Sequence, residues 1–339
     1  MSRLNKTLLM AGTALLGASL VSGAASAQTV SLKMAHWLPP VHHMTQTAQA
    51  WIDAVEKASG GSIKIQLDKN ALAKPPGQYD LAKNGVRDLA WSVGAYTPGR
   101  SPLFRFAEVP FASPNAETGS PGHIKWYLKH GFDKKEMGDT VLITSWVHGP
   151  GLLHSKKEVT KMEDMKGIKI RVGGGGVLTA KSLGAVPVNQ SATQSHESLT
   201  RGTTEAAFFP WEAVHGFRLA GLVKYHLEVP GGLYTTPFAL NMNKKKFEGL
   251  PAAARKLLMA EGGAKGAKLI GALWDKADEV GKQDAIKAGN KIQTLSDAET
   301  KRWAKAIKII TDQWIAKGNE MGLNGKALMD ELRQMMKAG

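Results

Sequence analysis

The chain opens with segments whose apolar residues recur at the spacing of strands and helices. Residues 30–35 alternate between apolar and polar side chains, as in a strand with one buried face. The next apolar positions have the spacing of an amphipathic helix: Ala48, Trp51, Ile52 and Val55. Residues 63–67 alternate again, 79–84 resemble a helix and 88–93 a strand. This β-α-β-α-β order predicts a sheet with helices on its faces.

A second series of the same kind follows after residue 140. It consists of strands expected at 141–146, 168–172, 205–209 and 238–242, and a helix at 177–183. Two successive α/β units predict an α/β fold with two lobes and a cleft between them, each lobe a mixed sheet flanked by helices. We expect lobe I at 28–150, with a returning segment at about 238–280, and lobe II at 151–237.

The last third of the chain is expected to be helical, and helices at about 281–339 are expected to pack across the lobes. Ser296 and Glu299 have the spacing of a capping box that opens a helix. Its apolar stripe is formed by Trp303, Ile307, Ile310 and Trp314, and Gly318 is expected to end it. We interpret these tryptophans as packing residues.

The first 27 residues have the arrangement of a secretory signal. Arg3 and Lys6 precede an apolar stretch, and Ala25-Ser26-Ala27 matches a cleavage site. The apolar stretch is short and contains two glycines, whereas a membrane span needs about 20 apolar residues. We therefore predict export, cleavage after Ala27, and a periplasmic protein of 312 residues. The chain contains no cysteine, which excludes disulfides, thiolate catalysis and a lipid anchor on cysteine.

The net charge is +15, or +13 without the signal. Such a charge can favour nucleic acids, anionic membranes or anionic ligands. The lysines are dispersed, however, and the densest run is Lys244-Lys245-Lys246. Dispersed charge together with export argues against nucleic acid as a partner.

Arg171 is the leading candidate for ligand binding. It lies at the end of the strand predicted at 168–172, and four glycines, Gly173 to Gly176, follow. A guanidinium matches two carboxylate oxygens, and the exposed amides of a glycine loop offer further donors. The loop precedes a predicted helix, whose N-terminus favours an anion; a hinge or a tight turn is the alternative. The glycine spacing fits neither a Walker loop nor a dinucleotide-binding fingerprint.

Several aromatic residues and histidines are candidates for the remainder of the cleft. They lie near predicted strand ends, where α/β sheets bind ligands, or in the turn before the returning strand: Trp37, Trp91, Phe209, Trp211, Tyr234, His36 and His42. Core packing is the alternative for the aromatic residues and is expected for Phe208. His36 and His42 either line the cleft or are ordinary surface histidines.

Catalysis finds little support in the sequence. The chain lacks Gly-x-Ser-x-Gly, and the histidines near residue 42 have no nearby acid before Asp53. We therefore expect no enzyme, metal or cofactor. A periplasmic enzyme acting on an organic acid in the same cleft remains the alternative.

Six segments, in order, resemble the DctP-type solute-binding proteins of TRAP (tripartite ATP-independent periplasmic) transporters. They are residues 34–40 with His42, 83–90, 108–111, 162–172, 183–188 and 243–251. The most specific is 162–172, which resembles the family's "edlkGlKiRv" segment and ends in Arg171-Val172. The resemblance implies two lobes that close over a small organic acid. It also implies delivery of the acid to a small and a large permease subunit, and a receptor that is a monomer or a dimer.

By this resemblance, Arg171 is the arginine that pairs with the ligand carboxylate. Three positions depart from the family: Gly149-Pro150-Gly151 replaces a segment with a second arginine, Phe209 replaces an asparagine, and Ala192 replaces an aromatic residue. Fewer polar groups favour a monocarboxylate with a hydrophobic or aromatic body. A receptor for an ABC importer or a sensor kinase is a further alternative.

Overall fold

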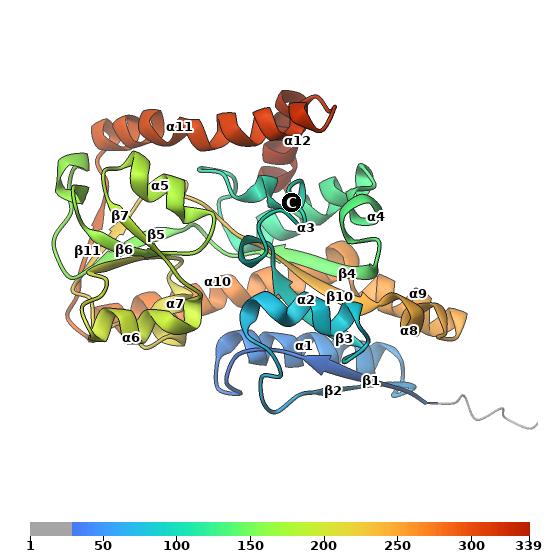
Figure 1. The fold of residues 1–339 in the computed structure, drawn as a ribbon. Helices are drawn as coiled ribbons and strands as arrows, with labels where there is room; N and C mark the ends of the chain where they lie inside the picture. The colour runs from blue at the N-terminus through green and yellow to red at the C-terminus, as the bar shows by residue number, and fades with distance from the viewer. Residues whose placement is uncertain (1–28) are drawn as a thin grey trace, which may run out of the picture.

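The computed structural model describes residues 29–339, so the predicted signal lies outside the described residues. The chain forms two lobes, each built on a mixed sheet with helices on its faces (Figure 1), which confirms the predicted α/β fold. Among residues 29–339, none of the helices has the length and apolar character needed to cross a bilayer.

The first sheet contains five strands, in the order β2 (Ile63–Leu67), β1 (Val30–Ala35), β3 (Leu89–Val93), β10 (Pro237–Asn243) and β4 (Thr140–Val147). β1 runs parallel to β2 and β3. β10 returns from the second lobe and pairs antiparallel with both β3 and β4. The helices of the first lobe are α1 (His43–Ala58), α2 (Gln78–Lys83), α3 (Ala116–Lys129), α4 (Phe132–Met137), α8 (Lys244–Glu248) and α9 (Ala252–Glu261).

The second sheet contains six strands, in the order β11 (Lys291–Thr294), β9 (Tyr225–Glu228), β5 (Leu152–Ser155), β8 (Ala206–Phe209), β6 (Lys169–Val172) and β7 (Val186–Asn189). β6 is parallel to β7 and β8, whereas β5 is antiparallel to β8 and β9. The helices of this lobe are α5 (Gly176–Ser182), α6 (Ser195–Thr200) and α7 (Glu212–Gly216). Short 3₁₀ turns complete the fold: η1 (Pro75–Gly77), η2 (Gly94–Tyr96), η3 (Phe104–Ala107), η4 (Met162–Met165) and η5 (Ala192–Gln194).

Three long helices follow β10, and the longest of them joins the lobes. α10 (Gly263–Lys287) packs on α1 and α3 of the first lobe and on α7 of the second (Figure 1). α11 (Asp297–Glu320) packs on α5, and α12 (Gly325–Ala338) packs on α3. The expectation of an all-helical last third is wrong at β11, which adds an edge strand beside β9.

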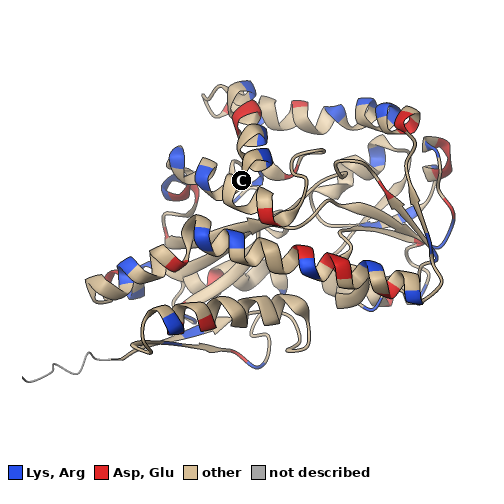
Figure 2. Cartoon of the chain, turned by 180° about the vertical axis from the view of Figure 1, so that it is seen from behind, with Lys and Arg blue, Asp and Glu red and all other residues tan. Residues whose placement is uncertain are grey.

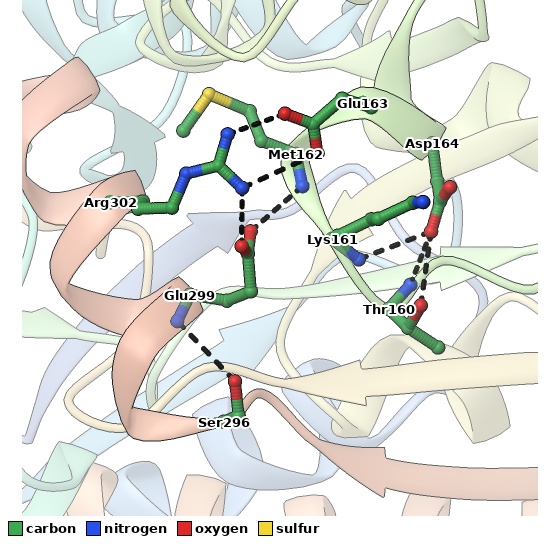
Figure 3. Close-up of polar contacts among 8 residues, drawn as sticks. All are labelled: Thr160, Lys161, Met162, Glu163, Asp164, Ser296, Glu299 and Arg302. Atoms are coloured by element: carbon green, nitrogen blue, oxygen red, sulfur yellow. Dashed lines mark hydrogen bonds and ion pairs between the residues drawn. The ribbon is translucent and has the colours of Figure 1, made fainter.

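The start of α11 is attached to the second lobe by polar contacts (Figure 3). The Ser296 hydroxyl accepts from the Glu299 N–H at 3.3 Å, so half of the predicted capping box is present. The Glu299 carboxylate does not turn back to Ser296: it accepts from the Met162 N–H at 2.9 Å and pairs with Arg302. Arg302 also pairs with Glu163. These contacts connect α11 to η4, close to the strand that carries Arg171.

The apolar stripe of α11 packs as predicted. Trp303, Ile307 and Ile310 are buried in the core of the second lobe. The predicted end at Gly318 is wrong, because the helix continues to Glu320. Gly318 instead lets α12 approach closely, since a Cβ there would lie 2.8 Å from the Gly325 Cα. The charged residues are distributed over the helices with acids and bases interspersed (Figure 2), as expected for a solvated surface.

Candidate functional site

A cavity lies between the two lobes. The centre of a water-sized sphere can occupy about 60 Å³ of it, and it is lined mainly by apolar and aromatic side chains. The first lobe contributes Trp37, Met44, Val93, Ala95, Tyr96 and Phe238. The second contributes Arg171, Gly173, Ala192, Phe209, Pro210, Glu212 and Phe217. The segments and helix that join the lobes add His148, Tyr234, Thr236 and Trp274.

Arg171 lies on β6, the strand between β7 and β8. Its Nη1 donates to the Phe208 carbonyl at 3.3 Å, and its Nη2 donates to the Gln190 carbonyl at 2.9 Å. The guanidinium stacks on the Phe209 ring, with its central carbon 4.0 Å from the ring centroid. These contacts fix the orientation of the group while leaving N–H donors for another partner, because an arginine carries five.

The environment of Arg171 is suited to an anion. The residue is 2% exposed, and no acid among residues 29–339 forms an ion pair with it. Its Nε is buried without a hydrogen-bond partner in the described structure. Burial lowers the pKa of Arg171, and the Tyr96 and Tyr234 hydroxyls oppose this shift. A buried cation without a counterion is costly, so a carboxylate at this place would stabilise it.

The glycine run forms a contact between the lobes. A Cβ on Gly174 would lie 2.4 Å from the Ala95 carbonyl oxygen, and one on Gly175 would lie 2.5 Å from a Glu108 carboxylate oxygen. Both partners belong to the first lobe. Bare backbone is therefore needed for the lobes to approach, and Glu108 already places a carboxylate beside Gly175. Only Gly173 of the run lines the cavity, with a Cβ position 3.8 Å from the Arg171 Nη2.

Four of the predicted site residues meet at the cavity: Arg171, Trp37, Phe209 and Tyr234. Trp37 is two residues beyond the end of β1, and Phe209 is the last residue of β8. The end of a strand thus brings both rings to the cavity. Tyr234 reaches the cavity from the segment that leads back to the first lobe.

The structure places the other four predicted residues outside the lining of this cavity. Trp91 lies within β3, beneath Trp37, with ring centroids 5.0 Å apart. Trp211 faces away, packs on His226 and donates its indole N–H to Glu228 at 3.0 Å. His36 is fully buried, with Nε2 hydrogen-bonded to the Asp68 carbonyl at 2.5 Å.

His42 has a structural contact of its own. Its Nδ1 accepts from the Met44 N–H at 3.2 Å and so caps the start of α1. Its ring packs on Phe217, which lines the cavity, with centroids 4.9 Å apart. Gly216 makes room for the imidazole, because a Cβ there would lie 2.5 Å from the His42 Nε2.

The sequence interpretation missed five lining residues whose side chains carry a nitrogen or an oxygen: Tyr96, His148, Glu212, Thr236 and Trp274. Glu212 opens α7 directly after the aromatic cluster, and its position after a strand end was an available signal. The other four lie on a 3₁₀ turn, on linking segments and on α10, and no motif marks them.

Two of the three positions that depart from the family carry small residues beside tyrosines. A Cβ on Gly151 would lie 2.2 Å from the Tyr234 ring, so this glycine makes room for the tyrosine. The backbone N–H of Ala192 donates to the Tyr96 hydroxyl at 2.9 Å. Two tyrosines, Tyr96 and Tyr234, thus line the same cavity as Arg171, beside positions where the family has a second arginine and an aromatic residue.

His42, His43 and Glu212 are close enough for a metal to be considered. His43 and Glu212 hydrogen-bond directly to each other, however. In His42, Nδ1 accepts a hydrogen bond, so the neutral ring carries its proton on Nε2 and offers no lone pair there. Burial acts to raise the pKa of Glu212, but the interactions with His43 outweigh burial and hold this pKa below its usual value. The cluster fits a buried hydrogen-bonded pair between the lobes better than a metal site.

The chain is similar to known solute receptors. Residues 34–317 match the family described as bacterial extracellular solute-binding protein, family 7 (DctP). A TRAP periplasmic solute-binding protein from Bordetella bronchiseptica, solved with bound (R)- and (S)-mandelate, is 29% identical. Its TM-score is 0.86, and the match covers 91% of this chain and 98% of that one.

Two further solved structures have comparable similarity. A TRAP solute-binding protein from Rhodoferax ferrireducens, in complex with copurified benzoate, is 31% identical with a TM-score of 0.85. A marine metagenome TRAP protein specific for aromatic acid ligands, in complex with 3-hydroxybenzoate, is 29% identical with a TM-score of 0.85. Each match covers 91% of this chain and 98% of the other. The chain therefore belongs to family 7 of the bacterial extracellular solute-binding proteins, the DctP-type receptors of TRAP transporters.

Proposed function

We propose that this receptor binds an aromatic monocarboxylate between its lobes and delivers it to a TRAP permease. The observation that carries the proposal is Arg171: a buried guanidinium, oriented by two carbonyls and a ring, without an acidic partner in the described structure. A bidentate carboxylate would supply the missing charge and satisfy the remaining N–H donors.

The apolar lining supports an aromatic body for the ligand. Trp37, Phe209, Phe217, Phe238 and Trp274 surround the space beside Arg171. Such a surface stabilises a ring by burial and by edge or face contacts, whereas a second carboxylate would lie in it without a cation. The bound mandelate, benzoate and 3-hydroxybenzoate of the three similar receptors agree with this class.

The family indicates the location and the membrane partners of the proposed receptor. TRAP receptors bind small molecules and work with membrane permease subunits. We infer that this receptor is exported to the periplasm, with cleavage after Ala27, and hands its ligand to a small and a large subunit. We further infer closure of the lobes on the ligand as a hinge motion in which the closed state binds more tightly.

A thermal-shift and calorimetric screen tests the proposal. Benzoate, mandelate and phenylacetate are compared with succinate and acetate. A ligand at 100 times its Kd is expected to stabilise the protein by ~2.7 kcal/mol. Arg171→Ala is expected to remove the shift for every acid, because losing one partner of a buried charge pair costs about 2–5 kcal/mol.

The control is Arg201→Ala, which removes an exposed arginine paired with Glu197 on the same lobe. It is expected to bind like the unmodified protein. Equal affinity of Arg171→Ala and the unmodified protein, with both folded by circular dichroism, would refute the assignment of Arg171. Binding of succinate in preference to every aromatic acid would refute the proposed ligand class.

A further inference from the structure

His148 presents a hydrogen-bond acceptor to the cavity. It follows β4 in the segment that joins the lobes, lines the cavity and is 4% exposed. Its Nδ1 lies 2.5 Å from the Gly149 carbonyl oxygen. A carbonyl only accepts, so Nδ1 carries the proton, and Nε2 of the neutral ring holds a lone pair.

The ring of His148 is held in place and kept neutral. Tyr234 meets it edge-on at 5.1 Å, and Trp274 stacks parallel to it at 6.3 Å. The Thr235 hydroxyl donates to the His148 carbonyl at 2.6 Å. Burial lowers the pKa of His148 to about 4, so the imidazole is uncharged at neutral pH. The hydrogen bond of the ring within residues 29–339 is the one at Nδ1, so Nε2 is left without a donor there.

The polar groups of the cavity divide into donors and acceptors. Arg171 and the indole N–H groups of Trp37 and Trp274 donate, whereas the His148 Nε2 and the Glu212 carboxylate accept. The hydroxyls of Tyr96, Tyr234 and Thr236 can do either. A carboxylate ligand satisfies Arg171 but offers nothing to the acceptors. An acceptor left unpaired in a closed site costs binding free energy, and sites of this kind discriminate against ligands that lack the donor.

We propose that the ligand carries a hydroxyl besides its carboxylate, and that this hydroxyl donates to the His148 Nε2. The receptor then selects hydroxylated aromatic acids over the parent acids. This inference rests on the proposed function and names the substrate class of the same cavity.

A hydroxyl fits the charges better than an ammonium group. Glu212 already has His43 as its partner, and the ligand carboxylate balances Arg171. A cationic donor would bring an additional buried charge without a counterion. Mandelate and 3-hydroxybenzoate, bound by two similar receptors, each contain a neutral hydroxyl of this kind.

Isothermal titration calorimetry with matched ligands tests the inference. The pairs are 3-hydroxybenzoate against benzoate and mandelate against phenylacetate; 3-methoxybenzoate and phenylglycine are the controls. At least one hydroxylated acid is expected to bind tenfold or more tightly than its parent. Methylation of the phenol removes the donor and is expected to abolish the preference, and phenylglycine is expected to bind at least tenfold more weakly than mandelate.

His148→Phe tests the acceptor itself, because it keeps a ring and removes the nitrogen. Its preference for the hydroxylated acid is expected to fall below twofold while benzoate binding is retained. His148→Gln restores an acceptor and is expected to keep part of the preference. His123→Phe removes another fully buried histidine outside the cavity and is expected to leave the preference unchanged.

The outcomes separate the two proposals. If none of the acids binds, the proposed function fails. If acids bind but the hydroxylated members have no advantage, only this inference fails. A preference that survives His148→Phe assigns the hydroxyl to another acceptor and overturns this inference. If that preference disappears in Glu212→Gln, the other acceptor is Glu212. Tighter binding of phenylglycine than of mandelate overturns the choice of a hydroxyl.

Discussion

The two sides of the cavity differ in chemistry. The first lobe offers Trp37, Met44, Val93 and Phe238, and its polar side-chain groups among the lining residues are the Tyr96 hydroxyl and the Trp37 indole N–H. The second lobe holds Arg171 on β6 and Glu212 at the start of α7. The side with the charges thus belongs to one lobe, and most of the other side is apolar.

This difference bears on how such a receptor closes. Under the proposed function, a carboxylate held by Arg171 presents the apolar body of the ligand to the first lobe. Closure then buries apolar surface on both partners, which stabilises the closed state by about 25 cal/mol per Å². The glycine run and the His43–Glu212 pair supply contacts between the lobes beside the ligand.

Removal of the Arg171 charge is expected to cause the largest loss of ligand affinity. The next largest loss is expected from a substitution that keeps the lobes from approaching each other. Gly174→Ala puts a methyl group 2.4 Å from the Ala95 carbonyl oxygen, so the second lobe cannot reach its place without a backbone shift. We expect benzoate to bind at least tenfold more weakly. Small-angle scattering of the protein with saturating benzoate is expected to give a larger radius of gyration than the unmodified protein.

Gly221→Ala is the matched control, since nothing lies within 4 Å of the added methyl group. It is expected to preserve both affinity and compaction. If Gly174→Ala closed and bound like the unmodified protein, the glycine run would have no part in closure, and the asymmetry between the two sides would rest on the side chains alone.

The spacing of apolar residues along the chain was enough to predict many strands of the two lobes and some of the residues that line the cavity. Sequence pattern identified all five strands of the first sheet, and strand-end position singled out Arg171, Trp37 and Phe209, which line the cavity. The strands β5, β7, β9 and β11 were missed, and each has only four residues, which give little alternation. β6 and β8 are equally short but were recognised, from the patterns at 168–172 and 205–209.

Other features depend on distant contacts. Trp211 and Phe209 are neighbours in the chain, yet Phe209 faces the cavity and Trp211 packs on His226. The turn after β8 decides this, and residue spacing does not. Likewise, His148 and Trp274 reach the cavity only because a linking segment and α10 pass between the lobes.

A smaller effect is expected at Phe209, the ring on the charged side. Phe209→Leu keeps an apolar side chain but removes the aromatic face 4.0 Å from the Arg171 guanidinium. A cation–π contact of this kind contributes about 0.5–2 kcal/mol. We expect benzoate to bind about three- to tenfold more weakly by calorimetry, because the guanidinium is less well oriented.

The ring and the arginine are expected to act together. In a double-mutant cycle, Phe209→Leu should cost much less affinity when Arg171 is already alanine. Equal losses in both backgrounds would show that Phe209 acts on the ligand independently of Arg171.

The smallest effect on binding is expected at Trp211, which follows the same strand but lies outside the cavity. Trp211→Phe removes the indole N–H that donates to Glu228 and leaves a ring to pack on His226. Loss of one such hydrogen bond costs about 0.5–1.5 kcal/mol of stability, so thermal denaturation should show a Tm lower by about 2 °C. The Kd for benzoate should stay within twofold. A tenfold loss of affinity at unchanged Tm would mean that Trp211 reaches the ligand, and that the aromatic cluster after β8 faces the cavity as a whole.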